Sequence, residues 1–458
     1  MTTRNRRFEI RFANQALANL RGRLLRDLSN EYFACLLAKR HDIGELVIFT
    51  VVEALYPTWY RSQSAAHLQV DKRFMEQVLI EADSRFDVDT VFDVHTHPFS
   101  ESNAWFSGGD DNDESTFAHY LYNTAPELNY GSIVFTRSAY KARIWDVDRG
   151  RACHYPALIK TQKPSERVPS PDDSSSGEDL VTNDINGMFH RSVLALGLEN
   201  MRLIANNQKI TIAGVGGIGS IIGEHLIHMG FSQINLIDFD TLELSNLNRI
   251  VGATYKDARG KRLKVEAIKE SLEKINPKAC VNAYPISVFD ESARHVFASS
   301  DWIIIATDNH ASRYRIQELA FEYYVPFITA GVNITVDEGQ IVDMSGEVIL
   351  VRMGDNICLT CLKRLSYNEI AKDLHPDGAV RNGLVQKGYV SGHGVKEPAV
   401  KTLNTHIATM AVDTLVNQYT ERCADVPILV YEDNGFPMIY EDKASLRNKN
   451  AECIICGM

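Results

Sequence analysis

Residues 209–249, KITIAGVGGIGSIIGEHLIHMGFSQINLIDFDTLELSNLNR, decide the fold of the second half of this chain. The run Ile210–Ala213 is continuously apolar, which is typical of a buried parallel strand. A glycine-rich turn follows, then an amphipathic helix and a second apolar strand that ends in Asp238. The turn has a GxGxxG pattern formed by Gly214, Gly216, Gly217 and Gly219. This β–α–β order brings the backbone against a phosphate at a helix N-terminus, so the stretch predicts a nucleotide site.

Polar residues after the second strand indicate which nucleotide reaction is involved. Asp238 by itself could hold the ribose of NAD, so an oxidoreductase is one candidate. The residues that follow favour another reaction. They are Asp240, Asn246, Arg249, Lys264 and, after the apolar strand Trp302–Ile305, Asp308. Hydride transfer has no need of Asn, Arg and Lys side chains around a triphosphate, whereas an enzyme that adenylates a carboxylate does.

Together these motifs closely resemble the ThiF/MoeB/HesA family, bacterial relatives of ubiquitin-activating enzymes, over about residues 187–458. The resemblance implies a Rossmann-like domain that uses ATP and Mg²⁺, with the glycine turn against the nucleotide. Asp238 would bond the ribose and Asp308 would coordinate Mg²⁺. Lys261 and Arg262 are further basic candidates, but Lys264 is followed by the Val-Glu pair usual in the family. The implied phosphate-binding group is Asn246, Arg249 and Lys264, with Asp240 beside it.

Relatives of this kind also use an arginine that reaches the ATP of a partner subunit. Arg191 is the candidate here, so the resemblance implies a homodimer formed through this domain. In the implied reaction a polypeptide C-terminal carboxylate attacks the α-phosphate and pyrophosphate leaves. Arg249, Lys264 and the Mg²⁺ held by Asp308 would stabilise the growing negative charge. Residues 362–422 contain no cysteine, so we expect adenylation without an obligatory internal thioester.

Two CxxC pairs predict a structural metal site. They are Cys358 with Cys361 and Cys453 with Cys456. Four thiolates form a closed tetrahedral zinc site. About ninety residues separate the pairs, a wide spacing that the ThiF/MoeB family shares. A redox pair or buried free thiols are the alternatives.

The first part of the chain carries a second metal-binding pattern. A strand predicted over 90–94 runs into His95-Thr96-His97-Pro98. Because side chains alternate along a strand, His95 and His97 point the same way and can share one metal ion. Ser107 and Asp110 follow as SxxD. The order HxHP then SxxD resembles the JAB/MPN (JAMM) metalloproteases, zinc isopeptidases that act on ubiquitin-like proteins.

The JAB/MPN resemblance implies specific roles. His95, His97 and Asp110 would be zinc ligands, with a fourth position left for water. Glu31, in the stretch EYFACLL, would be the general acid/base, and Ser107 would orient the reacting carbonyl. Asp111 and Asp113 are alternative acidic ligands, and the loop before Ser107 is about two residues longer than usual in the family. The simpler alternative is a pair of exposed histidines without a metal.

Composition sets limits on the partners and the compartment. The chain has 458 residues, a net charge of −11 and a pI near 5.7, so it lacks the basic surface that nucleic-acid binding needs. No apolar stretch is long enough for a membrane span, and we expect a cytoplasmic protein. In that compartment its eight cysteines favour metal sites or free thiols over disulfides. Residues 161–186, rich in Pro, Ser and acidic side chains, are predicted to be a flexible linker between domains 1–160 and 187–458.

The predicted fold class is therefore α/β: an N-terminal JAB/MPN-like domain and a C-terminal Rossmann-like ThiF domain with a four-cysteine zinc site. The main hypothesis is a bifunctional protein that adenylates the C-terminal Gly of a ubiquitin-like protein and also processes or deconjugates that protein. A conjugating enzyme, or another thiol or amine, would accept the activated carboxylate. The alternative is adenylation for sulfur transfer in cofactor synthesis, or of a small peptide, with the first domain as a binding module. A third hypothesis is a catalytically inactive scaffold.

Overall fold

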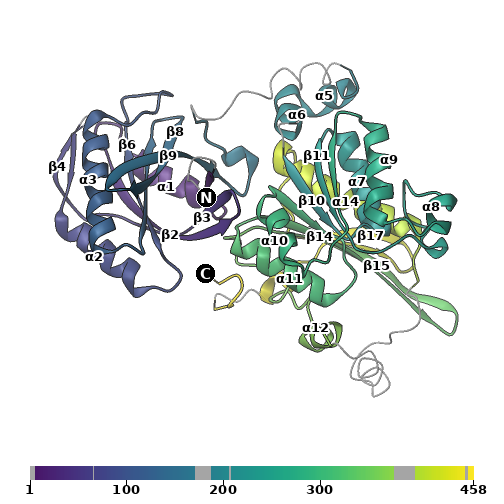
Figure 1. The fold of residues 1–458 in the computed structure, drawn as a ribbon. Coiled ribbons are helices and arrows are strands. Elements are labelled where there is room, and N and C mark those ends of the chain that lie inside the picture. The colour runs from purple at the N-terminus through teal and green to yellow at the C-terminus, as the bar shows by residue number, and fades with distance from the viewer. Residues whose placement is uncertain are drawn as a thin grey trace. The chain divides into compact units, whose positions relative to one another are not determined.

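The computed structural model describes residues 6–64, 67–170, 187–205, 208–375, 398–448 and 452–457 (Figure 1). The chain divides into two compact units, Met1–Ser176 and Gly177–Met458. Both units are mixed α/β structures. Among the described residues, no helix combines the length and the apolar character that crossing a bilayer requires.

The first unit is built on a closed barrel with the strand order β1-β3-β2-β6-β7-β8-β9. These strands are β1 (Arg7–Arg11), β2 (Phe33–Ile43), β3 (Leu46–Leu55), β6 (Thr90–Thr96), β7 (Asn129–Phe135), β8 (Tyr140–Asp148) and β9 (Arg151–Lys160). A separate hairpin joins β4 (Tyr60–Ser64) to β5 (His67–Val70). The helices are α1 (Ala16–Leu24), α2 (Lys72–Ser84) and α3 (Gly108–Thr124). The strand expected over 90–94 is confirmed as β6.

Alternating apolar residues fill the barrel of the first unit. Phe49 and Phe92 are fully buried and pack edge to face with ring centroids 5.4 Å apart. β1 closes the barrel because it pairs in parallel with both β3 and β9. Burying such aromatic side chains supplies most of the stabilisation of a core of this size.

The first unit extends further along the chain than predicted. Residues 161–170 were expected to begin a flexible linker, but they pack on the barrel and contain the short 3-10 turn Pro164–Glu166. Gln162 and Val168 are buried, and Gln162 Nε2 donates to Phe12 O at 3.1 Å. A few buried side chains thus override a composition that is otherwise typical of a linker. The rest of the predicted linker, 171–186, lies outside the described residues.

The second unit contains a mixed sheet with the order β12-β11-β10-β13-β14-β15-β16-β17. Strands β10 to β14 run parallel, and β15 to β17 are antiparallel. The bounds are β10 (Lys209–Ala213), β11 (Gln233–Ile237), β12 (Cys280–Tyr284), β13 (Trp302–Ile305), β14 (Phe327–Asp337), β15 (Gln340–Val351), β16 (Ile428–Asp433) and β17 (Pro437–Glu441).

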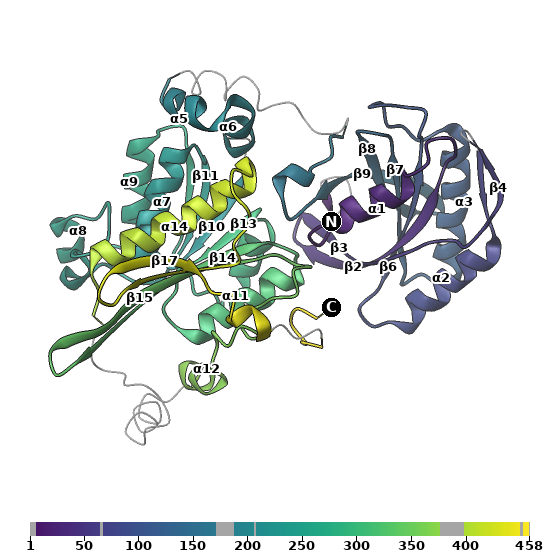
Figure 2. The same cartoon turned by 180° about the vertical axis from the view of Figure 1, so that it is seen from behind.

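Helices cover both faces of this sheet. They are α5 (His190–Leu196), α6 (Leu198–Ala205), α7 (Gly217–Met229), α8 (Tyr255–Arg259), α9 (Lys264–Ile275), α10 (Glu291–Ala298), α11 (His310–Glu322), α12 (Tyr367–Asp373) and α14 (Lys401–Thr420). Short 3-10 turns are η3 (Leu244–Asn246) and η4 (Ser445–Asn448). Helix α7 contacts both α9 and α14, whereas α10, α11 and α12 form a second contacting set. Figures 1 and 2 show α10 and α11 in front of the sheet from one side and α14 in front from the other.

The predicted β–α–β unit is confirmed. Helix α7 begins at Gly217, so two of the motif glycines form its first turn. Helix α14 begins at Lys401. Asn404 is therefore inside the first turn of a helix and not at its end. The strand Trp302–Ile305 is confirmed as β13.

Candidate nucleotide and metal sites

The glycine turn between β10 and α7 leaves no room for a side chain at two of its glycines. Gly214 has φ +88°, and a Cβ there would come within 2.8 Å of the carbonyl group of Ala306. A Cβ at Gly219 would overlap the carbonyl oxygen of Gly214. At Gly216, in contrast, a Cβ would meet no atom within 4 Å. The turn is thus packed against β13 on one side and open on the other, as a ligand cradle would be.

The first turn of α7 offers backbone donors to an anion. The first bond of the helix runs from Ser220 N to Gly216 O at 3.1 Å, so the N–H groups of residues 217–219 precede the helical ladder. The N-cap residue is Gly216, and no side chain caps the helix among the described contacts. Free N–H groups and the helix dipole together favour a phosphate or carboxylate at this point.

Asp238 and Lys264 lie beside the same turn. Asp238 Oδ2 accepts from Val215 N at 2.8 Å, which fixes the carboxylate against the glycines. Lys264, at the start of α9, donates from Nζ to Asp240 Oδ2 at 2.7 Å and lies 3.9 Å from Asp238 Oδ2. Burial raises the pKa of Asp238, while Lys264 and two backbone N–H groups oppose that rise. The structure thus brings Asp238, Asp240 and Lys264 together.

Of the two alternative basic residues, Lys261 is exposed, and Arg262 Nη1 pairs with Glu270 at 2.7 Å and with Asp257 at 3.3 Å. Lys264 is the one of the three with contacts to Asp238 and Asp240 among the described ion pairs.

Arg249 reaches the glycine turn from another direction. A Cβ at Gly217 would come within 3.0 Å of Arg249 Cγ and Cδ. Arg249 Nη1 donates to Ser245 O at 2.8 Å and to Asn248 Oδ1 at 3.0 Å, which orients the guanidinium. Asn246 holds the preceding 3-10 turn, since its Oδ1 accepts from Glu243 N at 3.0 Å. Arg249 is therefore in the candidate site, whereas the described contacts of Asn246 are local.

The end of β13 forms the remaining wall of the site. Parallel strands β10 and β13 end side by side, and a Cβ at Gly214 would come within 2.9 Å of Thr307 N. Asp308 follows with an exposed side chain. Thr307 Oγ1 is buried and has no hydrogen-bond partner among the described residues. Ligands of open α/β sheets bind at this carboxyl edge.

Arg191 is not brought to this site within the chain. It lies in α5, and the neighbouring Phe189 is near Gly230, at the opposite end of α7 from the glycine turn. Thirteen helical residues separate those ends by about 18 Å. A role for Arg191 at a nucleotide therefore requires another subunit.

The four predicted cysteines meet in one cluster. Their Sγ atoms all lie within 4.8 Å of one another, with Cys358–Cys453 at 3.8 Å and Cys361–Cys456 at 3.6 Å. A zinc ion held tetrahedrally by thiolates at about 2.3 Å needs sulfur atoms roughly 3.8 Å apart, so the residues fit zinc. Gln317, buried in α11, accepts from Leu359 N at 2.7 Å and holds the first CxxC loop. Sequence reasoning missed Gln317, which carries no motif.

The histidine cluster of the first unit also forms. Asp110 Oδ2 lies 3.6 Å from His95 Nε2 and 3.9 Å from His97 Nε2. His95 Nε2 and His97 Nδ1 are buried, and neither has a hydrogen-bond partner among the described residues. Three converging ligand atoms and orphaned buried nitrogens fit a single metal ion. The alternative of two exposed histidines is wrong, because both rings are buried.

A capping box positions Asp110. Ser107 N donates to Asp110 Oδ2 at 2.6 Å, and Asp110 N donates to Ser107 Oγ at 3.2 Å, at the start of α3. Among the other acidic candidates, Asp111 pairs with Arg143 and Asp113 is exposed. Burial opposes ionisation of Asp110, but electrostatic attraction to His95 and hydrogen bonding with Ser107 hold its pKa well below the ordinary value. Geometry therefore favours Asp110 as the third ligand.

Glu31 has the environment of a proton-transfer group. Its backbone N donates to Ser64 O at 2.9 Å, and its carbonyl accepts from Gln63 Nε2 at 2.7 Å, so the β4–β5 hairpin holds it. Burial raises the pKa of Glu31 to about 7, against the lowering effect of His95. A carboxyl group with a pKa near neutrality can both accept and return a proton.

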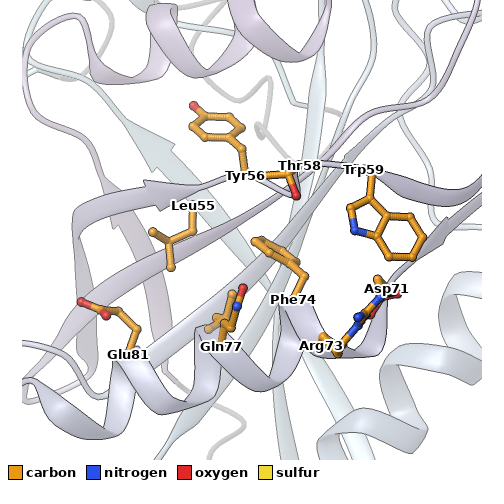
Figure 3. A pocket seen from close by; sticks show the side chains of 10 residues that line it. Leu55, Tyr56, Thr58, Trp59, Asp71, Arg73, Phe74, Gln77 and Glu81 are labelled. Carbon is orange, nitrogen blue, oxygen red and sulfur yellow. Dashed lines mark hydrogen bonds and ion pairs between the residues drawn. The ribbon is translucent and has the colours of Figure 1, made fainter.

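A pocket of about 430 Å³ lies at the base of the same hairpin (Figure 3). In Figure 3, Trp59, Asp71 and Arg73 gather at one end and Glu81 stands at the other. The lining comes from the end of β3, the segment that follows it, and α2 with its N-cap residue, and comprises Leu55, Tyr56, Thr58, Trp59, Asp71, Arg73, Phe74, Gln77, Val78 and Glu81.

A parallel sheet with a glycine turn, an acidic residue after its second strand and cations at its carboxyl edge defines a Rossmann-like nucleotide-binding protein. The chain belongs to the ThiF family, whose model matches residues 189–453, more than half of the sequence. The matched range lies within the second unit, so the JAB/MPN resemblance of the first unit stays a prediction.

Among curated proteins the chain is similar to "Adenylyltransferase and sulfurtransferase UBA4" of two yeasts. Identity is 26% over 251 residues for Candida glabrata, or 54% of this chain and 51% of the relative. For Kluyveromyces lactis it is 27% over 258 residues, or 56% and 52%. The chain spans about half the length of these relatives. The crystal structure of Escherichia coli MccB with AMPCPP and selenomethionine MccA covers 60% of this chain and 74% of its own, at 19% identity and a TM-score of 0.48.

Proposed function

We propose that the second unit is an ATP-dependent adenylyltransferase that activates the C-terminal carboxylate of a polypeptide. The observation that carries this proposal is the pair of cations beside the glycine turn. Arg249 lies against Gly217 in the first turn of α7, and Lys264 lies 3.9 Å from Asp238, the carboxylate that Val215 N fixes against the turn. Membership of the ThiF family and the adenylyltransferase activity for which the yeast relatives are named support the same reaction. Asp238 is suited to the ribose, since its carboxylate is fixed by Val215 N at the end of β11.

In the proposed adenylation reaction, negative charge develops on the oxygen that bridges the α- and β-phosphates of ATP. A carboxylate oxygen of the polypeptide attacks the α-phosphorus of ATP, the bond to the bridging oxygen breaks, and pyrophosphate leaves with the electron pair. Arg249, Lys264 and the N–H groups of α7 stabilise that negative charge without having to reorganise. Asp308 would hold Mg²⁺, which reduces the charge of the phosphates when bound. The product is a mixed anhydride between the carboxylate and AMP.

We propose sulfur transfer as the process that consumes this anhydride. The yeast relatives are named as adenylyltransferases and sulfurtransferases, which favours this alternative over a bifunctional conjugation and protease pathway. The cysteines outside the CxxC pairs include exposed Cys280 and Cys423 and buried Cys35. None lies in residues 362–422, so the acyl group would pass to an external sulfur donor or amine. The substrate would be a small protein with a C-terminal Gly or, as the second option, a short peptide.

We also propose a structural metal ion and a homodimer for the second unit. Cys358, Cys361, Cys453 and Cys456 would hold a structural zinc ion. Arg191 would reach the phosphates bound by a second copy of the chain, in a homodimer formed through the second unit.

A second candidate function belongs to the first unit. The convergence of His95, His97 and Asp110, with Glu31 at a pKa of about 7, favours metal-dependent hydrolysis of a peptide or isopeptide bond. His95, His97 and Asp110 would hold zinc, which lowers the pKa of a bound water toward neutrality. Glu31 would take the proton of that water and return it to the leaving amine. Without this activity, the first unit would act as a binding module.

Two assays test the adenylation proposal. Labelled pyrophosphate should exchange into ATP when a small protein ending in Gly-Gly is added, and hydroxylamine should trap the activated terminus as a hydroxamate. A variant of that protein extended beyond its terminal Gly should support neither reaction. ATP binding without exchange for any free polypeptide terminus would contradict the proposal.

A further inference from the structure

Asn404 is a buried amide in the first turn of α14, four residues after the N-cap residue Val400. Its side chain is 3% exposed, and its Oδ1 has no hydrogen-bond partner among the described residues. Buried polar atoms are nearly always paired, so an orphaned one calls for a functional explanation. The same turn of the helix contains Lys401 and Thr402, both exposed.

The surroundings of Asn404 are those of the candidate phosphate site. A Cβ at Gly217 would clash with Asn404 Nδ2 and would come within 3.0 Å of Arg249 Cγ and Cδ. The side chains of Asn404 and Arg249 therefore both lie against Gly217, in the first turn of α7. Asn248 Nδ2 donates to Ala399 O at 3.1 Å, which ties the start of α14 to the segment that carries Arg249. Two helix N-termini and a guanidinium thus converge on this amide.

The two helix N-termini beside Asn404 favour the binding of an anion. The first turns of α7 and α14 both carry N–H groups that precede the helical ladder, and both helix dipoles are positive there. Two acids of the site, Asp238 and Asp240, are engaged by Lys264. An amide can donate to a phosphate oxygen, and a half-turn of its plane exchanges Nδ2 and Oδ1.

We infer that Asn404 is a positioning residue that donates an amide N–H to a phosphate oxygen of the nucleoside triphosphate held at the first turn of α7. The inference rests on the proposed adenylation function and adds a residue that no motif of the sequence indicates. In this arrangement Arg249 supplies positive charge to the phosphate oxygens, and the Asn404 amide supplies a hydrogen bond that orients them.

The test compares ATP with adenosine by calorimetry on the full chain. Asn404→Asp keeps the size of the side chain and replaces the donor by a negative charge, so ATP should bind about 10-fold or more weakly. Adenosine lacks phosphates, and its affinity should change by less than about 2-fold. Asn404→Leu should weaken ATP selectively, and Asn404→Ser should recover part of the loss. Thr402→Asp is the matched control, because it adds the same charge in the same turn on an exposed position.

The outcomes separate the two proposals. An equal loss of ATP and adenosine in the Asn404 variants would mean a structural role and overturn the inference. Unchanged ATP affinity in all three variants would also overturn it while leaving the proposed function intact. If the wild type itself fails to bind ATP, the proposed function fails together with the inference. Should Asn404→Asp not fold, as judged by its melting temperature, the Leu and Ser variants carry the same comparison.

Discussion

Lys264 Nζ lies 2.7 Å from Asp240 Oδ2 and 3.9 Å from Asp238 Oδ2, so one ammonium group is held between two carboxylates. The two acids differ in exposure, since the side chain of Asp238 is 10% exposed and that of Asp240 is 52% exposed. Screening weakens an exposed pair more than a buried one. Phosphate oxygens would therefore displace Asp240 from the lysine more readily than Asp238.

Removing this ammonium should weaken adenylation. Lys264→Ala should lower the rate of pyrophosphate exchange by about 10²-fold or more, because a preorganised donor to the developing charge is lost. Lys261→Ala is the control, since Lys261 is exposed, and its exchange rate should stay within about 2-fold of wild type. The reverse order of effects would assign the phosphate contact to Lys261.

Asp308 should be needed for the metal-dependent part of the reaction. Asp308→Ala should reduce exchange to background at millimolar Mg²⁺, because the carboxylate that would hold the ion is lost. Asp337→Ala, in the exposed tip of the β14–β15 hairpin, should exchange normally. Wild-type exchange in Asp308→Ala would refute the role given to that carboxylate.

The two clusters should hold metal with different strength. Elemental analysis should find two zinc ions per chain, and a chelator should remove the ion at His95, His97 and Asp110 first with the fold intact. The four-cysteine ion should leave only with loss of structure, since its binding is part of the folding free energy. His95→Ala should leave one zinc ion, whereas His67→Ala, on exposed strand β5, should keep both. A single ion per chain that His95→Ala does not affect would contradict this assignment.

Glu31 should govern hydrolysis without governing metal content. Glu31→Gln keeps the size of the side chain and removes the base, so cleavage of a protein extended past its terminal Gly should fall by about 10²-fold or more. Zinc content and pyrophosphate exchange should both persist. Glu101→Gln, at an exposed position, should cleave normally. If the zinc-loaded wild type leaves every extended or conjugated protein intact, the first unit is a binding module.

Glu9 should make the first unit sensitive to acid. Its carboxylate is buried and lies 2.6 Å from Arg11 Nη2. Burial alone would raise its pKa, but Arg11, Lys160 and Arg7 lower the pKa from 4.5 to about 2. A folded-state pKa below the unfolded value means that this stabilisation is complete above pH 4.5 and is lost as pH falls through 2. A shift of this size corresponds to about 3 kcal/mol at neutral pH.

Hydrogen exchange at the amides of β1 would measure this effect in the intact chain. Glu9→Gln should speed exchange strongly at pH 7, and the difference from wild type should shrink as the pH approaches the folded-state pKa. Glu45→Gln, at an exposed position, should follow wild type across the whole range. A difference between Glu9→Gln and wild type that does not depend on pH would show that the ionised pair is not its source.

The parts of the fold that could be predicted are those governed by local pattern. The strand Ile210–Ala213, the glycine turn and Trp302–Ile305 are signalled by continuous apolar runs and by residues that only a tight turn requires. The same holds for His95 and His97, whose spacing brings both rings into one cluster with Asp110. The cysteine pairs could be matched because thiolates in CxxC spacing have few other uses.

Other features depend on contacts between distant residues and left no local signal. The parallel pairing of β1 with β3 and β9 joins segments far apart in the sequence, and no pattern in Arg7–Arg11 announces it. Gln162 and Val168 are single buried side chains in a polar stretch, so composition could not separate them from a linker. Asn404 belongs to no motif, and its closeness to Gly217 is visible only in three dimensions.

The cysteine cluster joins two points of the chain that are 95 residues apart, since Cys358 meets Cys453 and Cys361 meets Cys456. An ion bound there would act as a cross-link, and everything between the pairs, including α12, α14 and β16, would form one closed loop. A protease cut anywhere in that loop would open the chain without releasing a fragment. The nicked protein would still migrate as a single molecule under native conditions, and it would separate into two pieces only after the metal is removed and the fold is lost.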